Sequence, residues 1–174
     1  MVAILYRMQA GFPGDPNRAH PFSIEPCLVH ATTPPTAFGQ PVVIDATTNT
    51  VRPMVAGDVS STVIWGITVR PYPFQAPFGT AYGGAAFGAA TPAPLSAIDV
   101  LRSGYIMGIL NAGSAAVKKG SPVFVWTAVT SGNHIQGGFE SAANAGNTAA
   151  LDPTRYMYNG PADALGNVEI ICNP

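Results

Sequence analysis

Few residues of this chain have the type and spacing that metal or cofactor chemistry requires. The three histidines are His20, His30 and His134, and none is followed within four positions by a second metal-binding residue type. Zinc ligands usually recur at such spacings, and the chain contains no Cys-x-x-Cys pair. The sequence therefore predicts no metal site and no cofactor.

Catalytic groups are equally scarce. No Gly-x-Ser-x-Gly elbow is present, and the nine acidic residues are scattered singly along the chain. Paired carboxylates facing one cleft, as glycoside hydrolysis requires, are therefore not indicated. Most aspartates lie beside turn-forming residues: Asp45, Asp58, Asp99, Asp152 and Asp163. We expect a protein that is not an enzyme.

Nucleotide, nucleic-acid and membrane binding are also disfavoured. Residues 113–121 come nearest to a phosphate-binding loop, but the Gly-Lys-Ser/Thr order is absent and Pro122 follows where a helix would have to begin. The formal charge is −1, and the only basic cluster is Lys118-Lys119. Such a chain has no positive field for nucleic acid or anionic lipid. No apolar run approaches the roughly 20 residues of a membrane span.

The shortage of charge is the strongest compositional signal. Charged residues make up 10% of the 174 residues, whereas about 25% is usual for soluble domains. Hydrophobic residues make up 47%, with 19 Gly and 17 Pro. A bland surface of this kind favours a protein packed against many neighbours over a free catalyst. We expect a structural part of an assembly, with one domain at this length.

Short β-branched and aromatic runs bounded by turn residues predict an all-β fold, as a small antiparallel barrel or sandwich. No convincing amphipathic helix is present. Pro53 predicts an edge or an interruption at residues 51–54, because proline cannot donate to a strand ladder. The predicted strands are residues 27–30, 41–45, 61–69, 104–110, 122–126, 134–136, 155–158 and 167–172.

One pattern occurs twice. Residues 39–44 (GQPVVI) and 120–125 (GSPVFV) both read Gly-polar-Pro-Val-apolar-apolar, and each is followed by a polar turn and another strand signal. Two hairpins in equivalent places of a pseudo-symmetric barrel would explain the echo. Coincidence is the alternative, since six positions are few.

Two segments have the composition of contact elements. Residues 1–26 form a proline-interrupted, extended N-terminal arm, which either crosses to another subunit or folds over its own domain, residues 27–174. Residues 70–97 form a long Pro/Gly/aromatic insertion loop, and loops of this length are usually functional. Aromatic anchors on an uncharged loop suit a protein contact, and a poorly ordered insertion is the alternative. The candidate protein-contact residues are Phe12, Phe74, Phe78, Tyr82 and Phe87.

The two cysteines, Cys27 and Cys172, lie near opposite ends of the chain in apolar, strand-like segments. Two buried free thiols are the favoured interpretation, and a disulfide would require the two strands to be neighbours.

Several short structural motifs carry a resemblance to a known family. They are residues 8–15 (MQAGFPGD), the two Gly-x-Pro-Val segments, Gly57-Asp58 and residues 65–67 (WGI). On these motifs the chain resembles the structural cement, or head-decoration, proteins of tailed bacteriophages, with residues 71–97 as a lineage-specific loop.

The resemblance implies a small β-barrel that binds the outside of an assembled head and clamps adjacent major capsid subunits, often as a dimer or trimer. It implies no catalytic residue. We expect synthesis in a host cytoplasm and a final place on the outer capsid surface of the virion. The alternative is an all-β adhesion or carbohydrate-binding module on a fibre or tail, which would need exposed aromatic side chains on one rigid face.

Overall fold

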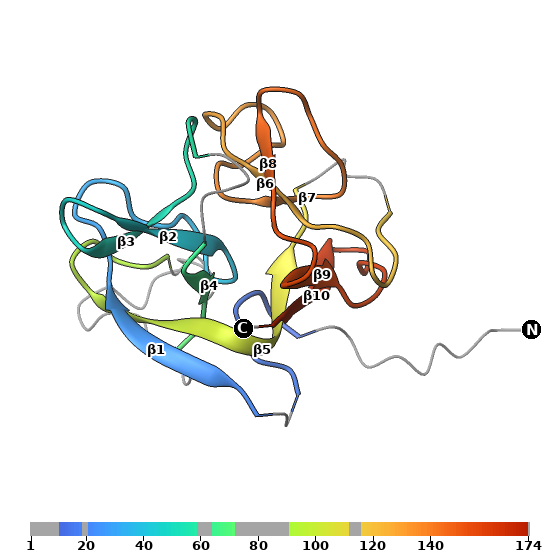
Figure 1. Ribbon diagram of the computed structural model, residues 1–174, viewed down its shortest axis with the longest axis horizontal. Coiled ribbons are helices and arrows are strands. Elements are labelled where there is room, and N and C mark those ends of the chain that lie inside the picture. Colours follow the sequence, from blue (N-terminus) through green and yellow to red (C-terminus); the bar gives the residue numbers. More distant parts are fainter. Residues whose placement is uncertain (1–10, 19–20, 59–63, 72–90, 112–115, 174) are drawn as a thin grey trace, which may run out of the picture.

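A computed structural model describes residues 11–18, 21–58, 64–71, 91–111 and 116–173, and this part of the chain contains strands and turns but no helix (Figure 1). The all-β prediction is confirmed. The ten strands are β1 (Ser23–Leu28), β2 (Pro41–Asp45), β3 (Thr50–Pro53), β4 (Gly66–Thr68), β5 (Ala97–Ile109), β6 (Phe124–Trp126), β7 (Phe139–Glu140), β8 (Thr148–Ala150), β9 (Tyr156–Tyr158) and β10 (Asn167–Cys172).

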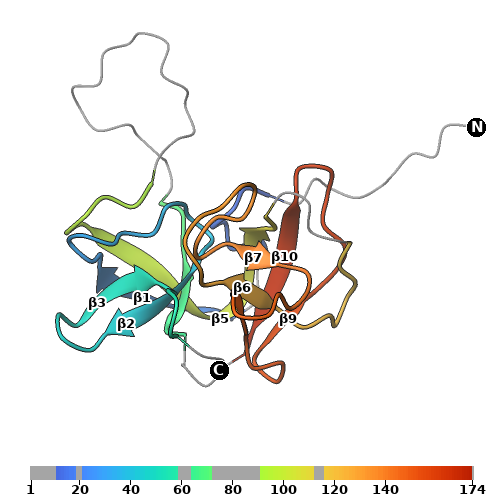
Figure 2. The ribbon, with the colours of Figure 1, turned by 90° about the horizontal axis from the view of Figure 1, so that it is seen from above.

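The strands form two antiparallel sheets that pack in a sandwich-like arrangement (Figure 2). The larger sheet has seven strands in the order β3-β2-β4-β5-β10-β9, with β1 also paired to β5, and the smaller has the order β7-β6-β8. Neither sheet closes into a barrel, so of the two predicted architectures the barrel is wrong. Strand β5 is 13 residues long and carries a positive φ of 127° at Gly104, where its neighbours change from β1 and β4 to β10.

The described chain repeats one arrangement twice, and β5 belongs to both copies. The first copy comprises β1 to β4 and the first half of β5, and the second comprises the rest of β5 with β6, β7, β9 and β10. In each copy one parallel bridge joins the end of the first strand to the third, Val29 to Val51 and Leu110 to Phe139.

The two Gly-x-Pro-Val segments make the same main-chain contacts in the two copies, so their predicted equivalence is confirmed at the level of hydrogen bonding. Both glycines adopt positive φ, 77° at Gly39 and 82° at Gly120. The matched contacts are Gly39 N to Thr68 O and Gly120 N to Tyr158 O, Thr68 N to Gln40 O and Tyr158 N to Ser121 O, Val69 N to Asp99 O and Asn159 N to Glu169 O, and the bridges Pro41–Ile67 and Pro122–Met157.

The hydrophobic cores follow the same repeat. One buried cluster contains side chains of the first copy, and the positions equivalent to them lie in the larger cluster. These pairs are Val29 and Leu110, Val42 and Val123, Val51 and Phe139, Ile98 and Val168, and Val100 and Ile170. Because both sequences keep apolar residues at these places, the same backbone can pack twice around different side chains.

Part of the predicted N-terminal arm lies on this chain's own sheet. Gly14 N donates to Met107 O (2.7 Å), and Met107 N donates to Asp15 O (3.0 Å), so residues 14–15 bond to the outward edge of β5. Strand β1 begins at Ser23, inside the predicted arm, and pairs with β5. The extent of the arm and its possible contacts with other subunits stay predictions.

Some predicted elements differ from the structure. Residues 134–136 form no strand but part of a turn, closed by mutual main-chain bonds between Ser131 and His134. Strand β5 begins at Ala97, at the end of the predicted loop, because pairing with β1 and β4 extends it. Both cysteines are free thiols, Cys27 half-buried and Cys172 buried.

Candidate interaction surface

Phe12 is the one predicted contact residue that falls among the described residues, and its side chain is 67% exposed. The Arg70 guanidinium lies 5.3 Å from the centre of the Phe12 ring. Arg70 N donates to Gly14 O (2.9 Å), which holds the segment containing Phe12 beside the end of β4. Phe74, Phe78, Tyr82 and Phe87 lie outside the described residues.

Phe12 therefore stands at the base of the predicted contact loop. A cavity of about 350 Å³ lies at the same base, between the residues that precede the undescribed segment 72–90 and those that follow it. Its lining is mostly apolar and includes Phe38, Val69, Pro71, Pro92 and Ile98. The structure thus places one predicted anchor beside Arg70, at the start of the predicted loop that contains the other four.

Leu95 is an exposed residue that sequence reasoning did not single out. Its side chain is 64% exposed, and its φ of 57° is unusual for a residue other than glycine. Bulky side chains held in this backbone region often mark functional positions. Among the residues that the structure describes, six further large apolar side chains are at least 45% exposed: Phe12, Phe22, Leu28, Val129, Ile135 and Leu165.

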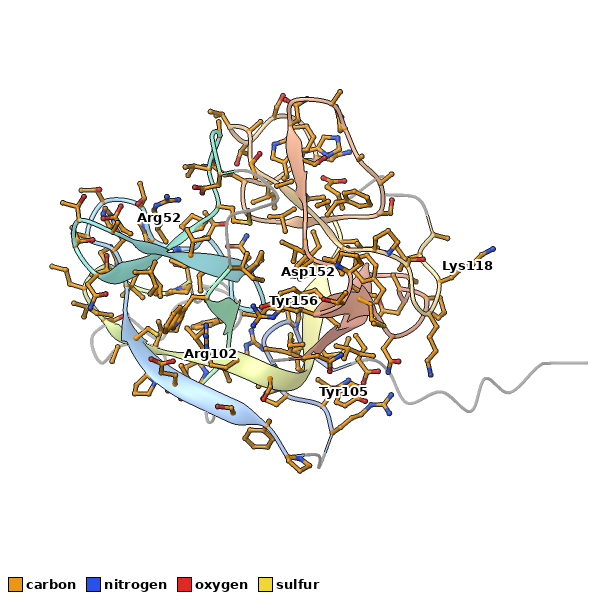
Figure 3. The ribbon with its side chains drawn as sticks, viewed as in Figure 1. Arg52, Arg102, Tyr105, Lys118, Asp152 and Tyr156 are labelled. Atoms are coloured by element: carbon orange, nitrogen blue, oxygen red, sulfur yellow. The ribbon has the colours of Figure 1, made fainter. Side chains whose placement is uncertain are left out.

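A larger groove of about 850 Å³ lies between β1 and the β2–β3 hairpin. Its walls include Pro26, Leu28, Ile44 and Trp65. The Arg102 guanidinium lies over the Trp65 ring, 3.7 Å from its centre, and Figure 3 shows Arg102 between β1 and β4. Trp65 is therefore half-covered by a cation rather than presented as an open aromatic platform.

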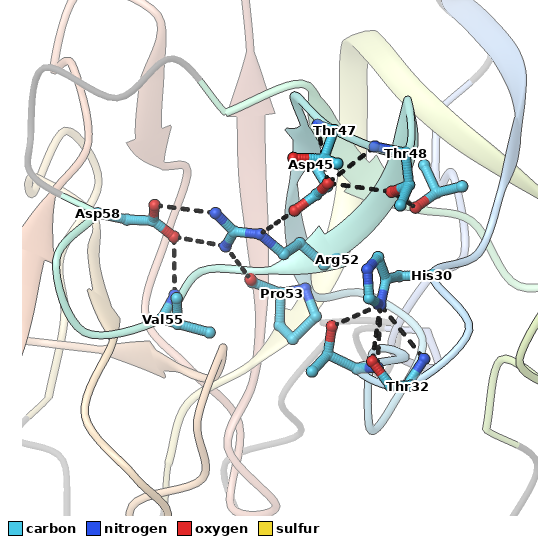
Figure 4. A network of polar contacts seen from close by, with 11 residues as sticks. His30, Thr32, Asp45, Thr47, Thr48, Arg52, Pro53, Val55 and Asp58 are labelled. Atoms are coloured by element: carbon cyan, nitrogen blue, oxygen red, sulfur yellow. Dashed lines mark hydrogen bonds and ion pairs between the residues drawn. The ribbon is translucent and has the colours of Figure 1, made fainter.

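Polar side chains around Arg52 fasten the β2–β3 hairpin (Figure 4). Arg52 donates to both oxygens of Asp58, at 2.8 and 3.2 Å, and its Nε lies 3.6 Å from Asp45. Burial opposes ionisation of Asp58, but bonds from Arg52 and the Val55 N–H outweigh it and lower the pKa of that carboxyl. Every member of this network has a partner, so the network is structural.

A buried carboxylate on β10 anchors the start of the described chain. Glu169 accepts hydrogen bonds from Asn17 Nδ2 (2.6 Å), Arg18 Nε (2.8 Å), Arg18 Nη2 (2.7 Å) and Asn159 Nδ2. Burial would raise the pKa of Glu169, but the bonds from Arg18, Asn159 and Asn17 hold the pKa below its usual value. Arg18 also lies 4.8 Å from the centre of the Tyr105 ring.

His134 is part of a turn. His134 Nδ1 lies 2.6 Å from Glu140 Oε1, and its ring stacks on Trp126 at a centroid distance of 4.2 Å. Asn111 Nδ2 donates to the same Glu140 oxygen (2.7 Å). These contacts fix the loop between β6 and β7, and Trp126 is only 5% exposed.

In the part of the chain that the structure describes, no group of three or more His, Cys, Asp or Glu residues could hold a metal ion. No helix in that part is long and apolar enough to cross a membrane. The notable surface features are instead exposed apolar side chains, the groove beside β1 and the cavity between the two ends of the predicted loop at 70–97.

A repeated all-β scaffold with exposed apolar side chains on its described surface is typical of structural proteins that bind other proteins. The comparison with protein families agrees: the model of the XM1 gp53 minor capsid protein family matches residues 1–172. The chain belongs to this family and is a phage capsid-associated protein.

A solved structure has the same fold. A chain in "The capsid of Myoviridae Phage XM1" aligns with a TM-score of 0.64 and 18% sequence identity, over 98% of this chain and 95% of that one. Curated proteins give no match. The resemblance to phage head proteins is thereby confirmed for the capsid, and the finer role follows as a proposal.

Proposed function

We propose that this chain is a decoration or cement protein, which binds the outer surface of an assembled phage head and stabilises contacts between major capsid subunits. The observation that carries the proposal is the exposed Phe12 beside Arg70, at the start of the predicted contact loop, in a chain of the minor capsid family. Binding to the assembled lattice alone would stabilise that lattice by mass action.

In this proposal the repeated β scaffold is a rigid spacer. The N-terminal arm and the loop at 70–97 reach across the junction between capsid subunits and bury apolar surface there. Burial contributes roughly 25 cal/mol per Å², less the cost of ordering the segments. Copies of the chain would meet as a dimer or trimer around a symmetry axis, which adds avidity.

The rival adhesion or carbohydrate-binding role finds less support. A sugar platform needs exposed aromatic rings on one rigid face, but Trp126 is buried and Trp65 lies under Arg102. The outer-surface role and the glycan role predict different partners for the purified protein.

Co-sedimentation with undecorated capsids tests the proposal. The full chain should saturate at a fixed copy number per capsid subunit and raise the temperature at which the particles break down. Deleting residues 74–90 should leave a folded protein, by circular dichroism, that no longer coats the particles. Full occupancy by the deletion variant would refute the role of the loop, and glycan binding without capsid binding would favour the adhesion module.

A further inference from the structure

The turn that precedes the Pro-Val strand is covered in one copy of the fold and open in the other. In the first copy the residues at this turn, Phe38 and Gly39, are buried. The start of the described chain lies over them, since a methyl group on Gly39 would stand 2.7 Å from Gly14 N and 3.1 Å from the Pro13 carbonyl carbon. An extended Pro-Gly segment therefore closes this turn.

The equivalent turn of the second copy has no such cover. Lys118, Lys119 and Gly120 are all exposed, and a methyl group on Gly120 would meet nothing within 4 Å. Figure 3 shows the side chain of Lys118 pointing away from the sheets. The position directly before the matched glycine holds the buried Phe38 in the first copy and Lys119 in the second. The second copy thus presents two cations where the first has a buried aromatic ring.

The lysine turn is held in place by the rest of its copy. Val117 is 3% exposed and belongs to the larger hydrophobic cluster. Gly120 N donates to Tyr158 O (2.7 Å). Lys118 N donates to Ser121 Oγ (3.1 Å), and Ser121 N donates to Lys118 O (3.0 Å). The two ammonium groups therefore stand on a fixed turn, so a partner that binds them does not have to order this backbone first.

The lysine pair differs from the other cations of the chain. Exposed lysines are common and need no explanation alone, but these two are adjacent and are the only lysines in the sequence. Among the described residues neither lysine forms an ion pair, whereas Arg18, Arg52 and Arg102 all pair with acids. The lysines are thus unpaired charges in a chain that has few charges.

The carboxylates that would pair with these lysines are not spare on this chain. All nine acidic residues lie in the described part of the sequence. Each of them except Asp99 already accepts a hydrogen bond or an ion pair within the chain. One exposed aspartate does not match two adjacent lysines. A different protein with clustered acids is therefore a better partner than a second copy of this chain.

We infer that the turn at Lys118, Lys119 and Gly120 is a docking site for an extended acidic segment of another capsid component, which covers this turn as residues 13–14 cover Gly39. Its carboxylates accept charge-assisted hydrogen bonds from the two ammonium groups, and the missing side chain of Gly120 lets its backbone approach. A nucleic acid is a weaker match, because the formal charge of the chain is −1 and phosphate binding needs several basic contacts. The inference rests on the proposed function and names the chemistry of the capsid surface that the chain meets.

Zero-length cross-linking tests the contact directly. A carbodiimide joins an amine to a carboxylate only where the two are in contact, and Lys118 and Lys119 are the only side-chain amines of this chain. On fully coated capsids, mass spectrometry should find amide cross-links from these lysines to Asp or Glu residues of another capsid protein. Cross-links to a second copy of this chain instead, or no cross-link at full coating, would overturn the inference.

Binding to purified undecorated capsids measures what the pair contributes. The test variant is Lys118→Gln/Lys119→Gln, and Lys118→Arg/Lys119→Arg keeps both charges. Ala142→Glu/Ala143→Glu is the matched control, because it lowers the net charge by the same amount at exposed residues of the loop between β7 and β8. Circular dichroism and thermal melting establish that each variant is folded. The concentration for half-saturation of the capsids is the readout.

At low ionic strength the Gln variant should need about five- to ten-fold more protein, and the difference should fall below about two-fold at ~1 M salt, where charges are screened. The Arg variant and the control should bind like the intact chain. If the Gln variant also binds like the intact chain, or the control is weakened as much, the inference is wrong and the proposed function stands. If the intact chain does not coat capsids, the proposed function fails and the inference fails with it.

Retention on immobilised duplex DNA separates carboxylates from phosphates as the partner. Neither the intact chain nor the Gln variant should be retained at physiological salt. If the intact chain is retained and the Gln variant is not, the lysines bind phosphate, and the inference is overturned.

Discussion

The two copies of the fold share a main-chain frame but differ in the connection before the last strand. In the first copy 29 residues, 70–98, separate Val69 from its partner Asp99, whereas in the second only nine, 160–168, separate Asn159 from Glu169. The first copy therefore carries the predicted contact loop at a site where the second has a tight turn. A hairpin end that can close in nine residues tolerates a long insertion without disturbing the frame.

The copies differ again at the outward edge of their first strand. In the second copy Met107 lies on this edge, where its N–H donates to Asp15 O and its carbonyl accepts from Gly14 N. The equivalent residue of the first copy is Pro26, which has no N–H to offer and lines the open groove. The second copy is thus sealed by the chain's own start, while the first keeps an edge that proline protects from unwanted strand pairing.

The largest expected effect concerns the two Gly-x-Pro-Val glycines, because the start of the described chain packs closely against Gly39 and nothing packs against Gly120. Gly39→Ala would place a methyl group 2.7 Å from Gly14 N and 2.8 Å from Met107 O, whereas the same change at Gly120 meets nothing within 4 Å. Both glycines have positive φ, so both variants carry the backbone penalty. Chemical denaturation should show a loss of about 3–4 kcal/mol for Gly39→Ala and ~1 kcal/mol for Gly120→Ala. Equal losses would contradict the asymmetry.

A smaller effect is expected at the matched acids. Glu169 is 7% exposed and accepts bonds from three side chains, whereas its counterpart Asp99 is exposed. Glu169→Gln should lower the free energy of unfolding by ~2 kcal/mol, because bonds to a charged acceptor are replaced by weaker ones. Asp99→Asn, the control, should change it by less than ~0.5 kcal/mol. If Glu169→Gln lowered the free energy of unfolding by as little as Asp99→Asn, the hydrogen bonds to Glu169 would add no stability.

The pH dependence of that loss gives a separate test. The pKa of Glu169 is lowered in the folded state from an ordinary value of 4.5, so its contribution is complete above that value. The contribution is lost as the pH falls through the lower folded pKa. The stability difference between the intact chain and Glu169→Gln should therefore be constant from pH 7 to 5 and shrink toward pH 3. A difference that grew on acidification would show that the carboxylate is not stabilised.

The last comparison concerns reactivity rather than stability. Burial raises the pKa of Cys27 and raises that of Cys172 to about 12, and Cys172 is only 1% exposed. At pH 8 a thiol reagent should label Cys27 slowly and Cys172 only after unfolding in denaturant. Cys27→Ser should abolish labelling of the native protein. Persistent native labelling of that variant would mean that the second copy opens locally.

Some of the fold was predictable because its signals are local. Runs such as residues 41–45 contain β-branched residues next to a turn glycine, and they form strands as expected. The Gly-x-Pro-Val echo also marked two equivalent places. The rest of the repeat was not visible, because the matched strands share only apolar character, as Val51 and Phe139 do, and hydrogen-bond register leaves no trace in composition.

The interaction surface was less predictable for a similar reason. Phe12 was identified because an aromatic residue among glycines and prolines has little core to join. Leu95 and Leu165 gave no such signal, since leucine is ordinarily a core residue. Glu169 looked like any single acid, because its partners Asn17 and Arg18 lie about 150 positions earlier in the chain.

Strand β5 is both the last strand of one copy and the first strand of the other. A pull that separates the two ends of the molecule would therefore travel along one covalent backbone of 13 residues, roughly 43 Å when extended. Neighbouring strands are hydrogen-bonded along its sides, so such tension would load many bonds in shear together instead of opening them one by one. Separating the two copies would therefore require β5 to be pulled away from its paired strands β1, β4 and β10.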